Sequence, residues 1–475
     1  MANNKSFIKD ILKELSEENL GIFAGAGFSM AAGFVSWKEL LRPISDEIGL
    51  DIDKEKDLLA VAQYHCNENS SNRHKLSQQI IDEFSRIAST TRNHEIIAKL
   101  PINEYWTTNY DKLLESALIE NGRIPDVKYT NEQLAYTKPR RDCIVYKMHG
   151  DVDHADKAIL TKDDYESYYL THGPYITALS GSLVSKTFLF IGFSFTDPNL
   201  DYILSRIRVN YHQNQRRHFC FLRSVSEDEY HGRRDEFEYD KLKQELFIKD
   251  LQRFNIKTIL VSEYIEITQL LEEIFSKYKR KTIFISGAAH EYYDWDKFVS
   301  FEMMHELSKS LIAKEYKIVS GFGLGVGSSI ITGALEEIYL AKKQSISNQL
   351  ILRPFPQDIT GKIPKDELWN KYRSNMCEYA GVAIFIFGNK LVDGKTINSD
   401  GLIKEFDIAL DKGLFTIPIG STGYVAKQIY DMILVNPTKY GYSTPDLINE
   451  LKILGTSKKT EDIVSSVLRI LDIIT

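Results

Sequence analysis

Residues Asn19–Ser29 read NLGIFAGAGFS, an apolar run that ends in a cluster of small residues. A short apolar strand followed at once by Gly25-Ala26-Gly27 and a helix start is typical of an α/β sheet that binds a nucleotide. Glycines at such a strand end let the backbone approach a pyrophosphate, and the free N–H groups of the following helix attract it. A tight turn from strand to helix would use the same residues, so this stretch alone leaves both interpretations open.

A second stretch of this kind, KIVSGFGLGVGSS, occupies Lys317–Ser329. Around both stretches, short apolar segments alternate with amphipathic ones, which indicates mostly parallel strands covered by helices on both faces. We therefore predict an α/β fold with two Rossmann-like parallel sheets. The expected strands are Gly21–Ala24, Glu104–Thr107, Cys143–Met148, Thr187–Ile191, His218–Leu222, Thr258–Val261, Thr282–Ser286, Lys317–Val319, Gln349–Leu352, Val382–Phe387 and Phe415–Pro418.

The change from one half of the chain to the other follows an amphipathic stretch, Glu263–Phe275. The cations of KYKRK (Lys277–Lys281) are favourable near a helix C-terminus, and a new strand follows them directly. We place the boundary near Tyr278, which divides the chain into residues 1–278 and 279–475. Two helices are predicted at the end of the chain, Pro445–Leu454 and Thr460–Ile474, with Thr460 as an N-cap of the second.

Composition limits the function classes. The 475 residues are 43% hydrophobic and 26% charged, which fits a globular protein of two or three domains and excludes a disordered or fibrous chain. A net charge of −7 argues against a general nucleic-acid binder. No apolar run reaches the roughly 18 residues of a membrane helix and no secretory signal is present, so we expect a cytoplasmic protein. The four cysteines form no CxxC pair, so no metal site is expected.

Polar motifs close two further strands of the first half. Thr107-Thr108-Asn109-Tyr110-Asp111 follows one strand, and His149-Gly150 follows another, in VYKMHGD. Open α/β sheets bind ligands at the carboxyl ends of their strands, and a histidine there is suited to act as a general base. Each motif alone could be structural, but the three in this order indicate a nucleotide site.

A third polar element, Gly192–Asn199 (GFSFTDPN), follows the strand Thr187–Ile191. Asp-Pro is a good turn starter, so one interpretation is a structural cap. The other interpretation, which we favour, has Gly192 and Ser194 facing the ligand.

The first half resembles the sirtuin family. The shared motifs are GAGxS at Gly25–Ser29, Ala32-Gly33, TxNxD at Thr107–Asp111 and the His149-Gly150 pair, and the resemblance covers about residues 1–270. It implies NAD binding in a Rossmann-type sheet, with the nicotinamide–ribose bond as the target.

The same resemblance implies the roles of individual residues. Asn109 would hold the nicotinamide ribose or a water, Asp111 would recognise the carboxamide, and His149 would be the base on a ribose hydroxyl. It remains open at this point whether His149 activates the water directly. The implied NAD-binding residues are Ala24, Gly25, Ala26, Gly27, Ser29, Thr108, Asn109, Asp111, His149, Gly192 and Ser194.

Departures from the family pattern point away from a protein deacylase. The four zinc cysteines are missing, and Phe34–Lys38 (FVSWK) stands where deacylases have IPDFR. The GFSxxDPN element looks like the sirtuin-like domains of bacterial defence proteins, which hydrolyse NAD. Nicotinamide is a cationic leaving group, so this hydrolysis requires no metal and no strong acid.

The second half carries a glycine cluster without an obvious catalyst. Gly321–Gly327 has four glycines in seven residues but fits neither GxGxxG nor a P-loop. Its N–H groups offer a nest for anions, and Arg353 at another strand end can pair with a phosphate. Plain turns, and a solvated helix face for Lys371 and Arg373, are the alternative. The expected ligand residues are Ser286, Gly287, Ala288, Gly321, Phe322, Gly323, Leu324, Gly325, Arg353, Lys371, Asn389, Glu405, Thr422 and Gly423.

Residues 280–430 resemble the SLOG family of nucleotide sensors. The PGGxGTxxE motif of the related LOG enzymes is absent, and the segment that stands nearest to it contains Glu405, which either contacts a ribose hydroxyl or faces solvent. Loss of the catalytic motif with retention of the glycine cluster favours a sensor over a second enzyme.

The order of the two halves is similar to that of the NAD-consuming effectors of the Thoeris antiphage system. That resemblance implies that a TIR-domain partner makes a cyclic ADP-ribose isomer, that the SLOG half binds it, and that the sirtuin-like half then depletes NAD in an abortive infection. It also implies a homotetramer or higher assembly. The alternatives are an NAD-dependent protein deacylase and a catalytically silent nucleotide sensor.

Overall fold

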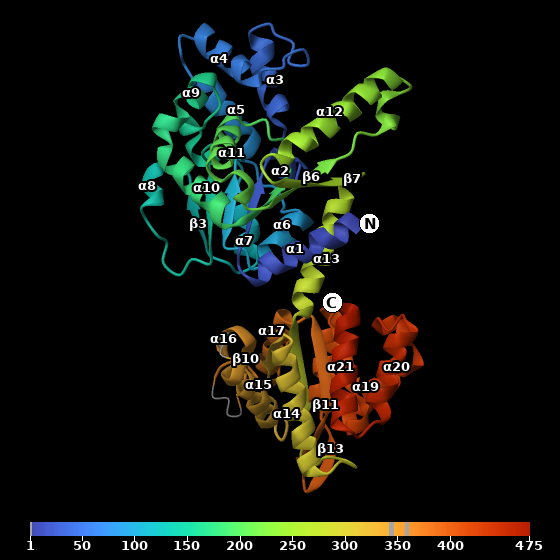
Figure 1. The fold of residues 1–475 in the computed structure, drawn as a ribbon. Helices are drawn as coiled ribbons and strands as arrows, with labels where there is room; N and C mark the ends of the chain where they lie inside the picture. The colour runs from blue at the N-terminus through green and yellow to red at the C-terminus, as the bar shows by residue number, and fades with distance from the viewer. Residues whose placement is uncertain (1, 342–345, 357–360) are drawn as a thin grey trace. The chain divides into compact units, whose positions relative to one another are not determined.

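The computed structural model describes residues 2–341, 346–356 and 361–475. The chain folds into two compact units, Met1–Ile274 (unit 1) and Phe275–Thr475 (unit 2). The division falls inside helix α13 (Ile265–Arg280), the helix that also holds Tyr278. Each unit is built on a parallel sheet surrounded by helices, as the α/β prediction requires (Figure 1).

The sheet of unit 1 shows seven parallel strands in the described residues, in the order β3-β4-β2-β1-β5-β6-β7. Strands β2 to β4 lie on one side of β1 and strands β5 to β7 on the other, so the strand order reverses between β1 and β5. Such a switch point is where open α/β sheets bind ligands. The strands are β1 (Leu20–Ala24), β2 (Glu104–Thr107), β3 (Pro125–Lys128), β4 (Cys143–Lys147), β5 (Thr187–Ile191), β6 (His218–Arg223) and β7 (Ile256–Val261).

The predicted strands of unit 1 are confirmed to within two residues at each end, but β3 was missed. Its sequence, PDVK, begins with proline and alternates polar residues, so it shows no apolar run. The structure buries Asp126 and Lys128 as an ion pair with a 2.9 Å separation between Oδ1 and Nζ. Pairing of the two charges is what lets a polar segment form a buried strand.

Helices fill the connections of unit 1. Several begin with a side-chain cap, among them Asp57 at α4 and Asp197 at α11. The helices are α1 (Ala2–Ser16), α2 (Ala26–Met30), α3 (Trp37–Glu47), α4 (Leu58–Glu68), α5 (His74–Phe84), α6 (Arg92–Lys99), α7 (Leu113–Glu120), α8 (Asn131–Leu134), η1 (Val152–Lys157), α9 (Lys162–Thr171), α10 (Gly173–Ser185), α11 (Pro198–Tyr211), η2 (His212–Asn214), η3 (Glu227–Tyr230) and α12 (Arg234–Gln252).

Unit 2 repeats the plan with a five-stranded parallel sheet in the described residues, ordered β10-β9-β8-β11-β14. Here the strand order reverses between β8 and β11. A separate antiparallel hairpin of β12 and β13, which the sequence did not predict, follows β11. The strands are β8 (Thr282–Ala288), β9 (Lys317–Ser320), β10 (Leu350–Leu352), β11 (Val382–Phe387), β12 (Asn389–Val392), β13 (Lys395–Asn398) and β14 (Phe415–Ile419).

The predicted helix Thr460–Ile474 is confirmed, but the predicted cap is wrong. Thr460 is already the first helical residue, the N-cap position falls on Lys459, and no side chain caps this end. The helices of unit 2 are α14 (Lys297–Ala313), α15 (Gly327–Ala341), α16 (Ile346–Gln349), α17 (Lys365–Tyr379), α18 (Asp400–Asp411), η4 (Gly420–Thr422), α19 (Tyr424–Val435), η5 (Pro437–Tyr440), α20 (Pro445–Thr456) and α21 (Thr460–Ile474).

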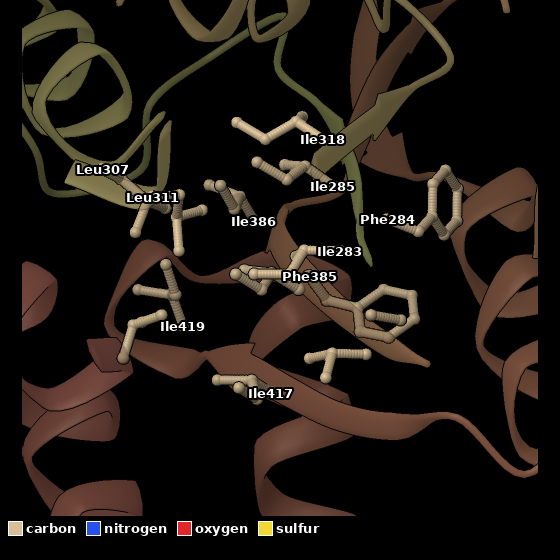
Figure 2. Packing of buried hydrophobic residues seen from close by; sticks show 14 of the residues in the cluster. Ile283, Phe284, Ile285, Leu307, Leu311, Ile318, Phe385, Ile386, Ile417 and Ile419 are labelled. Atoms are coloured by element: carbon tan, nitrogen blue, oxygen red, sulfur yellow. The ribbon is translucent and has the colours of Figure 1, made fainter. Parts of the chain in front are cut away.

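Branched side chains from the central strands form the core of unit 2 (Figure 2). Ile285 on β8 and Ile386 on β11 are buried, and Leu307 and Leu311 of α14 belong to the same cluster. Burial on both faces of these strands explains why they read in the sequence as continuous apolar runs.

None of the described helices combines the length and the apolar character that a bilayer crossing demands.

The glycines at the end of β1 are required by packing between two loops. The N–H of Gly25 donates to the carbonyl of Ile191 at 3.0 Å, and the N–H of Gly27 donates to that of Gly192 at 2.9 Å. A Cβ on Gly192 would lie 2.1 Å from the backbone nitrogen of Phe28, and the φ of Gly192 is +64°. The two loops therefore meet backbone to backbone at the switch point, and no side chain fits between them.

We predict that Gly192→Ala destabilises the protein by about 2–4 kcal/mol, because the added methyl meets backbone atoms and the conformation is left-handed. Urea unfolding monitored by tryptophan fluorescence measures the change. Gly181→Ala is the matched control: Gly181 lies in α10, and a methyl group added there would have no atom within 4 Å, so this change is neutral or stabilising. Equal stability of both variants would contradict the packing argument.

Candidate functional site

Asn109 lies at the carboxyl end of β2, where it links two strand-end loops. Its side-chain Nδ2 donates to the carbonyl oxygen of Gly25 and to Oγ of Ser29, each at 3.0 Å. Its backbone N–H donates to Oγ1 of Thr107 at 3.0 Å. The amide of Asn109 is therefore held across the ends of β1 and β2.

A small cavity lies beside this amide. Its volume is about 10 Å³, roughly what one water molecule needs. Ligand pockets for molecules of drug size or larger occupy several hundred Å³, so a dinucleotide enters here only after the surrounding loops move. The lining residues are Ala24, Phe28, Ser29, His94, Thr107, Asn109, Asp111, Leu114 and Glu115.

Two carboxylate oxygens at this cavity lack a hydrogen-bond partner among the described residues. Oδ1 of Asp111 accepts the N–H of Leu113 at 3.0 Å, but its buried Oδ2 has no partner. The buried Oε2 of Glu115, one helical turn later, has none either. Unsatisfied buried acceptors are rare and costly, so this cavity is suited to a ligand group that donates hydrogen bonds.

A fully buried lysine lies directly behind these carboxylates. Nζ of Lys147 on β4 donates to Oε1 of Glu115 at 3.0 Å and to Oδ2 of Asp151 at 2.5 Å. It also donates to the backbone carbonyls of Tyr110 and Asp111 at 3.1 and 2.6 Å. Lys147 thereby fixes the loop after β2 to β4. This residue was not predicted from the sequence, although a lysine inside the apolar run CIVYKM is a usable signal.

Burial acts on the pKa values of the ionisable groups in this cluster in opposite directions. Burial raises the pKa of Glu115, and the cation of Lys147 offsets only part of that effect. Burial alone would lower the pKa of Lys147, but Glu115 and Asp151 outweigh it, so the lysine stays charged.

His149 follows β4 and contacts Asp197 rather than the cavity beside Asn109. Its Nε2 lies 3.1 Å from Oδ2 of Asp197, and both side chains are buried. The hydroxyl of Tyr165 donates to the same Oδ2 at 3.3 Å. Burial acts to raise the pKa of Asp197, but the His149 ring and the hydrogen bonds to the carboxylate outweigh it, so the pKa lies below its usual value. Sequence reasoning treated Asp197 only as a turn starter and did not find Tyr165.

The remaining residues expected at the NAD site are spread around this core. Ser29 and Ala24 line the cavity, whereas Ala26 is exposed. The backbone N–H of Thr108 donates to the carbonyl of Ala24 at 3.4 Å. Ser194 is exposed, and its Oγ lies 2.8 Å from Oγ1 of Thr196. The structural interpretation of Asp-Pro as a helix start is confirmed, because Asp197 caps α11 with Pro198 as its first residue.

In unit 2, three of the singled-out residues form a buried polar cluster. Oγ of Ser286 donates to Oε2 of Glu405 at 2.6 Å, and Nε of Arg373 lies 3.3 Å from Oε1 of the same carboxylate. The guanidinium of Arg373 also stacks over Phe355 and Trp369. Burial raises the pKa of Glu405 despite these partners. The alternative that Glu405 faces solvent is wrong, and so is a solvated helix face for Arg373.

The two other cations near this cluster differ in their surroundings. Arg353 is half-buried, and its Nη2 donates to the hydroxyl of Tyr379 at 3.0 Å. Its buried Nε has no partner among the described residues. Lys371 instead pairs with Glu367 at 2.7 Å on the outer face of α17, with 68% of its side chain exposed. The structure does not bring Lys371 into the cluster.

Several expected ligand residues shape the loops. Oδ1 of Asn389 accepts the backbone N–H groups of His290 and Glu291 at 2.8 and 3.0 Å. Oγ1 of Thr422 accepts the N–H of Phe387 and donates to the carbonyl of Ile419. These side chains use their hydrogen-bonding groups to hold backbone.

The glycine cluster of unit 2 packs as its counterpart in unit 1 does. A Cβ on Gly323 would lie 1.8 Å from the carbonyl oxygen of Gly287, and one on Gly325 would lie 2.0 Å from that of Ala289. Ala288 ends β8 in this same loop region, and a Cβ on Gly321 would touch the Phe355 ring. Phe322 and Leu324, between these glycines, are exposed, and Gly423 packs against the Tyr293 ring.

Within the described ranges, no group of three or more His, Cys, Asp or Glu side chains is arranged to hold a metal ion. Cys143 and Cys220 are buried and free.

Both units of the chain match known protein families. Residues 103–248 match a SIR2-like domain, and residues 266–474 match the Sir2- and TIR-associating SLOG family. A Bacillus cereus (strain MSX-D12) protein, NAD(+) hydrolase ThsA, is 54% identical over 429 residues, which cover 90% of this chain and 89% of that protein. The protein of the same name from Cytobacillus dafuensis is 46% identical over 480 residues, covering 99% and 97%. That from Acinetobacter baumannii (strain 532279) is 48% identical over 436 residues, covering 90% of each.

We predict that His94 at the cavity makes the stability of unit 1 depend on pH. Burial lowers the pKa of His94 to about 3, and burial lowers that of His218 in β6 to about 3 as well. An unfolded histidine binds its proton near pH 6.5, so the free energy of unfolding falls as the pH falls from about 6.5 to about 3. Each histidine contributes a slope of roughly 1.4 kcal/mol per pH unit.

Urea unfolding at a series of pH values checks this slope. His94→Asn removes one histidine's share of it, and the double variant with His218→Asn removes both. A slope that is the same in the wild-type protein and the double variant would contradict the assignment.

Proposed function

This chain belongs to the ThsA family of NAD(+) hydrolases, and on that premise we propose that unit 1 cleaves NAD+ into nicotinamide and ADP-ribose at the cavity beside Asn109. The observation that carries the assignment of the site is the pair of unpartnered carboxylate oxygens at this cavity, next to the amide of Asn109 at the switch point of the sheet. NAD+ is the substrate, and the residues below act on it.

The chemistry of the leaving group suits these residues. Nicotinamide leaves as a neutral molecule from a cationic ring, so the bond between the ring nitrogen and C1′ of the ribose breaks without prior protonation. The ribose then carries oxocarbenium-like positive charge, and a water adds its oxygen to C1′ and loses a proton to a base. The protein's contribution is to orient the ribose and the water and to place negative charge nearby.

Each residue of the site is assigned one part of this reaction. Oδ2 of Asp111 accepts a hydrogen bond from the carboxamide NH₂ of nicotinamide. The amide of Asn109, which already bridges Gly25 and Ser29, turns to the nicotinamide ribose or to the water. His149 is the base on a hydroxyl of the ribose. The backbone ends of β1 and β5 hold the pyrophosphate side of the dinucleotide.

Asn109→Ala tests the catalytic assignment. We expect kcat for nicotinamide release from NAD+ to fall by at least roughly 10²-fold, because an oriented polar group is lost, while the Kd for NAD+ changes by about threefold or less. Release is measured by chromatography, and Kd by calorimetry.

Wild-type rates in Asn109→Ala would contradict the assignment of this residue. Parallel assays with an acyl-lysine peptide test the deacylase alternative: consumption of NAD+ that depends on the peptide would favour that activity over hydrolysis.

Unit 2 is proposed to be the sensor that controls this hydrolysis. In this proposal a cyclic ADP-ribose isomer, made by a TIR-domain protein, binds at the carboxyl ends of β8 to β11, and the chain acts as a homotetramer or higher assembly in the cytoplasm. NAD depletion on activation would then end phage infection with the death of the host cell. The match to a Sir2- and TIR-associating SLOG family supports this proposal, as do the buried Arg373–Glu405–Ser286 cluster and the partner-free Nε of Arg353.

A signal that activates the hydrolase must supply enough binding free energy to shift its conformational equilibrium. A ligand shifts a conformational equilibrium only by its difference in affinity for the two states. A change from 1:99 to 99:1 needs about 5.5 kcal/mol of such preference. Charge-assisted hydrogen bonds from arginine to a pyrophosphate contribute on the order of 1.5–3 kcal/mol each, so two or three of them suffice.

Arg353→Ala tests the sensor site. We expect the concentration of isomer that gives half-maximal NAD+ cleavage to rise by about 10- to 100-fold, with the maximal rate unchanged, because one charge-assisted contact is lost. The assay uses the full chain with a panel of cyclic ADP-ribose isomers. Lys452→Ala on α20, an exposed lysine in the same unit, is the control with an unchanged response. An unaltered response of Arg353→Ala would remove this residue from the site.

A further inference from the structure

The contact between His149 and Asp197 joins two loops that follow strands far apart in the sheet. His149 follows β4 and Asp197 follows β5, and β2 and β1 lie between these strands. Three strand spacings separate β4 from β5 by about 14 Å. Both loops therefore reach over the ends of β2 and β1 to bring Nε2 of His149 within 3.1 Å of Oδ2 of Asp197. This contact lies above the switch point, where the dinucleotide is proposed to bind.

We propose that Asp197 is a positioning residue that holds the proton of His149 on Nε2 and leaves Nδ1 as the basic atom. The proposal deepens the proposed function and rests on the role of His149 as a base. In this arrangement, Nδ1 takes a proton from a hydroxyl of the bound ribose or from the attacking water. The imidazolium that forms is stabilised by the carboxylate of Asp197 at its other nitrogen.

Asp197 is held on both of its oxygens. Oδ1 accepts the backbone N–H of Leu200 at 2.9 Å as the cap of α11, and the positive end of that helix favours a negative charge there. Oδ2 faces the His149 ring and also accepts the hydroxyl of Tyr165. These two donors hold the carboxylate in place, and the His149 ring lies against its Oδ2.

The hydroxyl of Tyr165 lies close to all three polar atoms of this contact. It is 3.4 Å from Nδ1 and 3.5 Å from Nε2 of His149, and 3.3 Å from Oδ2 of Asp197. We assign its single proton to the charged carboxylate, the stronger acceptor, which leaves the lone pair of Nδ1 free to act as the base.

The other titratable groups around the pair do not compete with this arrangement. The hydroxyl of Tyr168 donates to the carbonyl of Met148 at 3.0 Å. Burial raises the pKa of Tyr165 and of Tyr168 well above the usual value, so both stay neutral. Burial lowers the pKa of His172, which stacks on Tyr168. Among the described residues, Asp197 is the carboxylate that pairs with His149.

Asp197→Asn is the variant that tests the proposal. Asparagine is an equally good N-cap, so α11 keeps its cap and the fold is retained. Its side-chain NH₂ would donate to Nε2 of His149 and drive the ring proton onto Nδ1, the atom that has to act as the base. We expect kcat for NAD+ cleavage to fall by roughly 10²- to 10⁴-fold with KM changed by about threefold or less, the range known for loss of the correct histidine tautomer.

A second measurement detects the tautomer of His149 directly. ¹⁵N NMR of the full chain labelled at histidine is expected to show the Nε2–H form of His149 in the wild-type protein and the Nδ1–H form in Asp197→Asn, with His149→Ala for assignment. Asp57→Asn is the matched control: Asp57 caps α4 through the N–H of Ala60 and has no role in either proposal, so we expect its kcat and the His149 spectrum to stay unchanged.

The outcomes separate the two proposals. If the wild-type protein cleaves no NAD+ with any cyclic ADP-ribose isomer, the proposed function fails, and the tautomer of His149 still decides the role of Asp197. If NAD+ is cleaved and His149→Ala is inactive, but Asp197→Asn keeps the wild-type kcat or the wild-type tautomer, the role assigned to Asp197 is overturned.

Discussion

In each sheet, two neighbouring strand ends approach so closely that no side chain fits between them, those of β1 and β5 at the switch point of unit 1 and those of β8 and β9 in unit 2. In unit 1 the N–H of Gly27 bonds directly to the carbonyl of Gly192, and in unit 2 Gly323 packs on the carbonyl of Gly287. This contact lies at the start of α2 in unit 1 and shortly before α15 in unit 2. In unit 1 it brings the carbonyl of Gly25 to the amide of Asn109, so the geometry of the candidate active site depends on it. The glycines were interpreted as room for a pyrophosphate, and the structure adds a second reason for them, the backbone of the neighbouring loop.

Each unit also buries a cation that is paired with one or two carboxylates. Lys147 joins Glu115 and Asp151 in unit 1, and Arg373 joins Glu405 in unit 2. Removing such charges from water is expensive, and a hydrophobic cluster of the same size is often as stable. The contacts of Lys147 with two backbone carbonyls indicate what the arrangement achieves, since they tie the loop that carries Asn109 to the strand that carries His149.

The cavity beside Asn109 is closed to a dinucleotide as it stands. About 10 Å³ accommodates a water-sized group, so under the proposed function the loops around the cavity would have to move before NAD+ enters. The amide of Asn109 and the His149–Asp197 pair both bridge these strand ends. Under the proposed function, this opening would rearrange contacts made by the groups to which we assign catalysis. In such an enzyme, the same contacts would control both the entry of the substrate and the alignment of the catalytic groups. Such control suits a hydrolase that consumes an essential cofactor.

The sequence by itself determined the strands, the parallel α/β class and the motifs at the strand ends, because apolar runs and glycine clusters are local features. It missed β3, where the ion pair of Asp126 and Lys128 replaces an apolar run, and it put the cap of the last helix one residue late. Only the tertiary structure decided which motif side chains meet. Lys371 faces outward while Arg373, two residues later, is buried, and His149 finds Asp197 across two intervening strands. Such contacts depend on the order of strands in the sheet and on the path of loops between them, and no spacing along the chain contains that information.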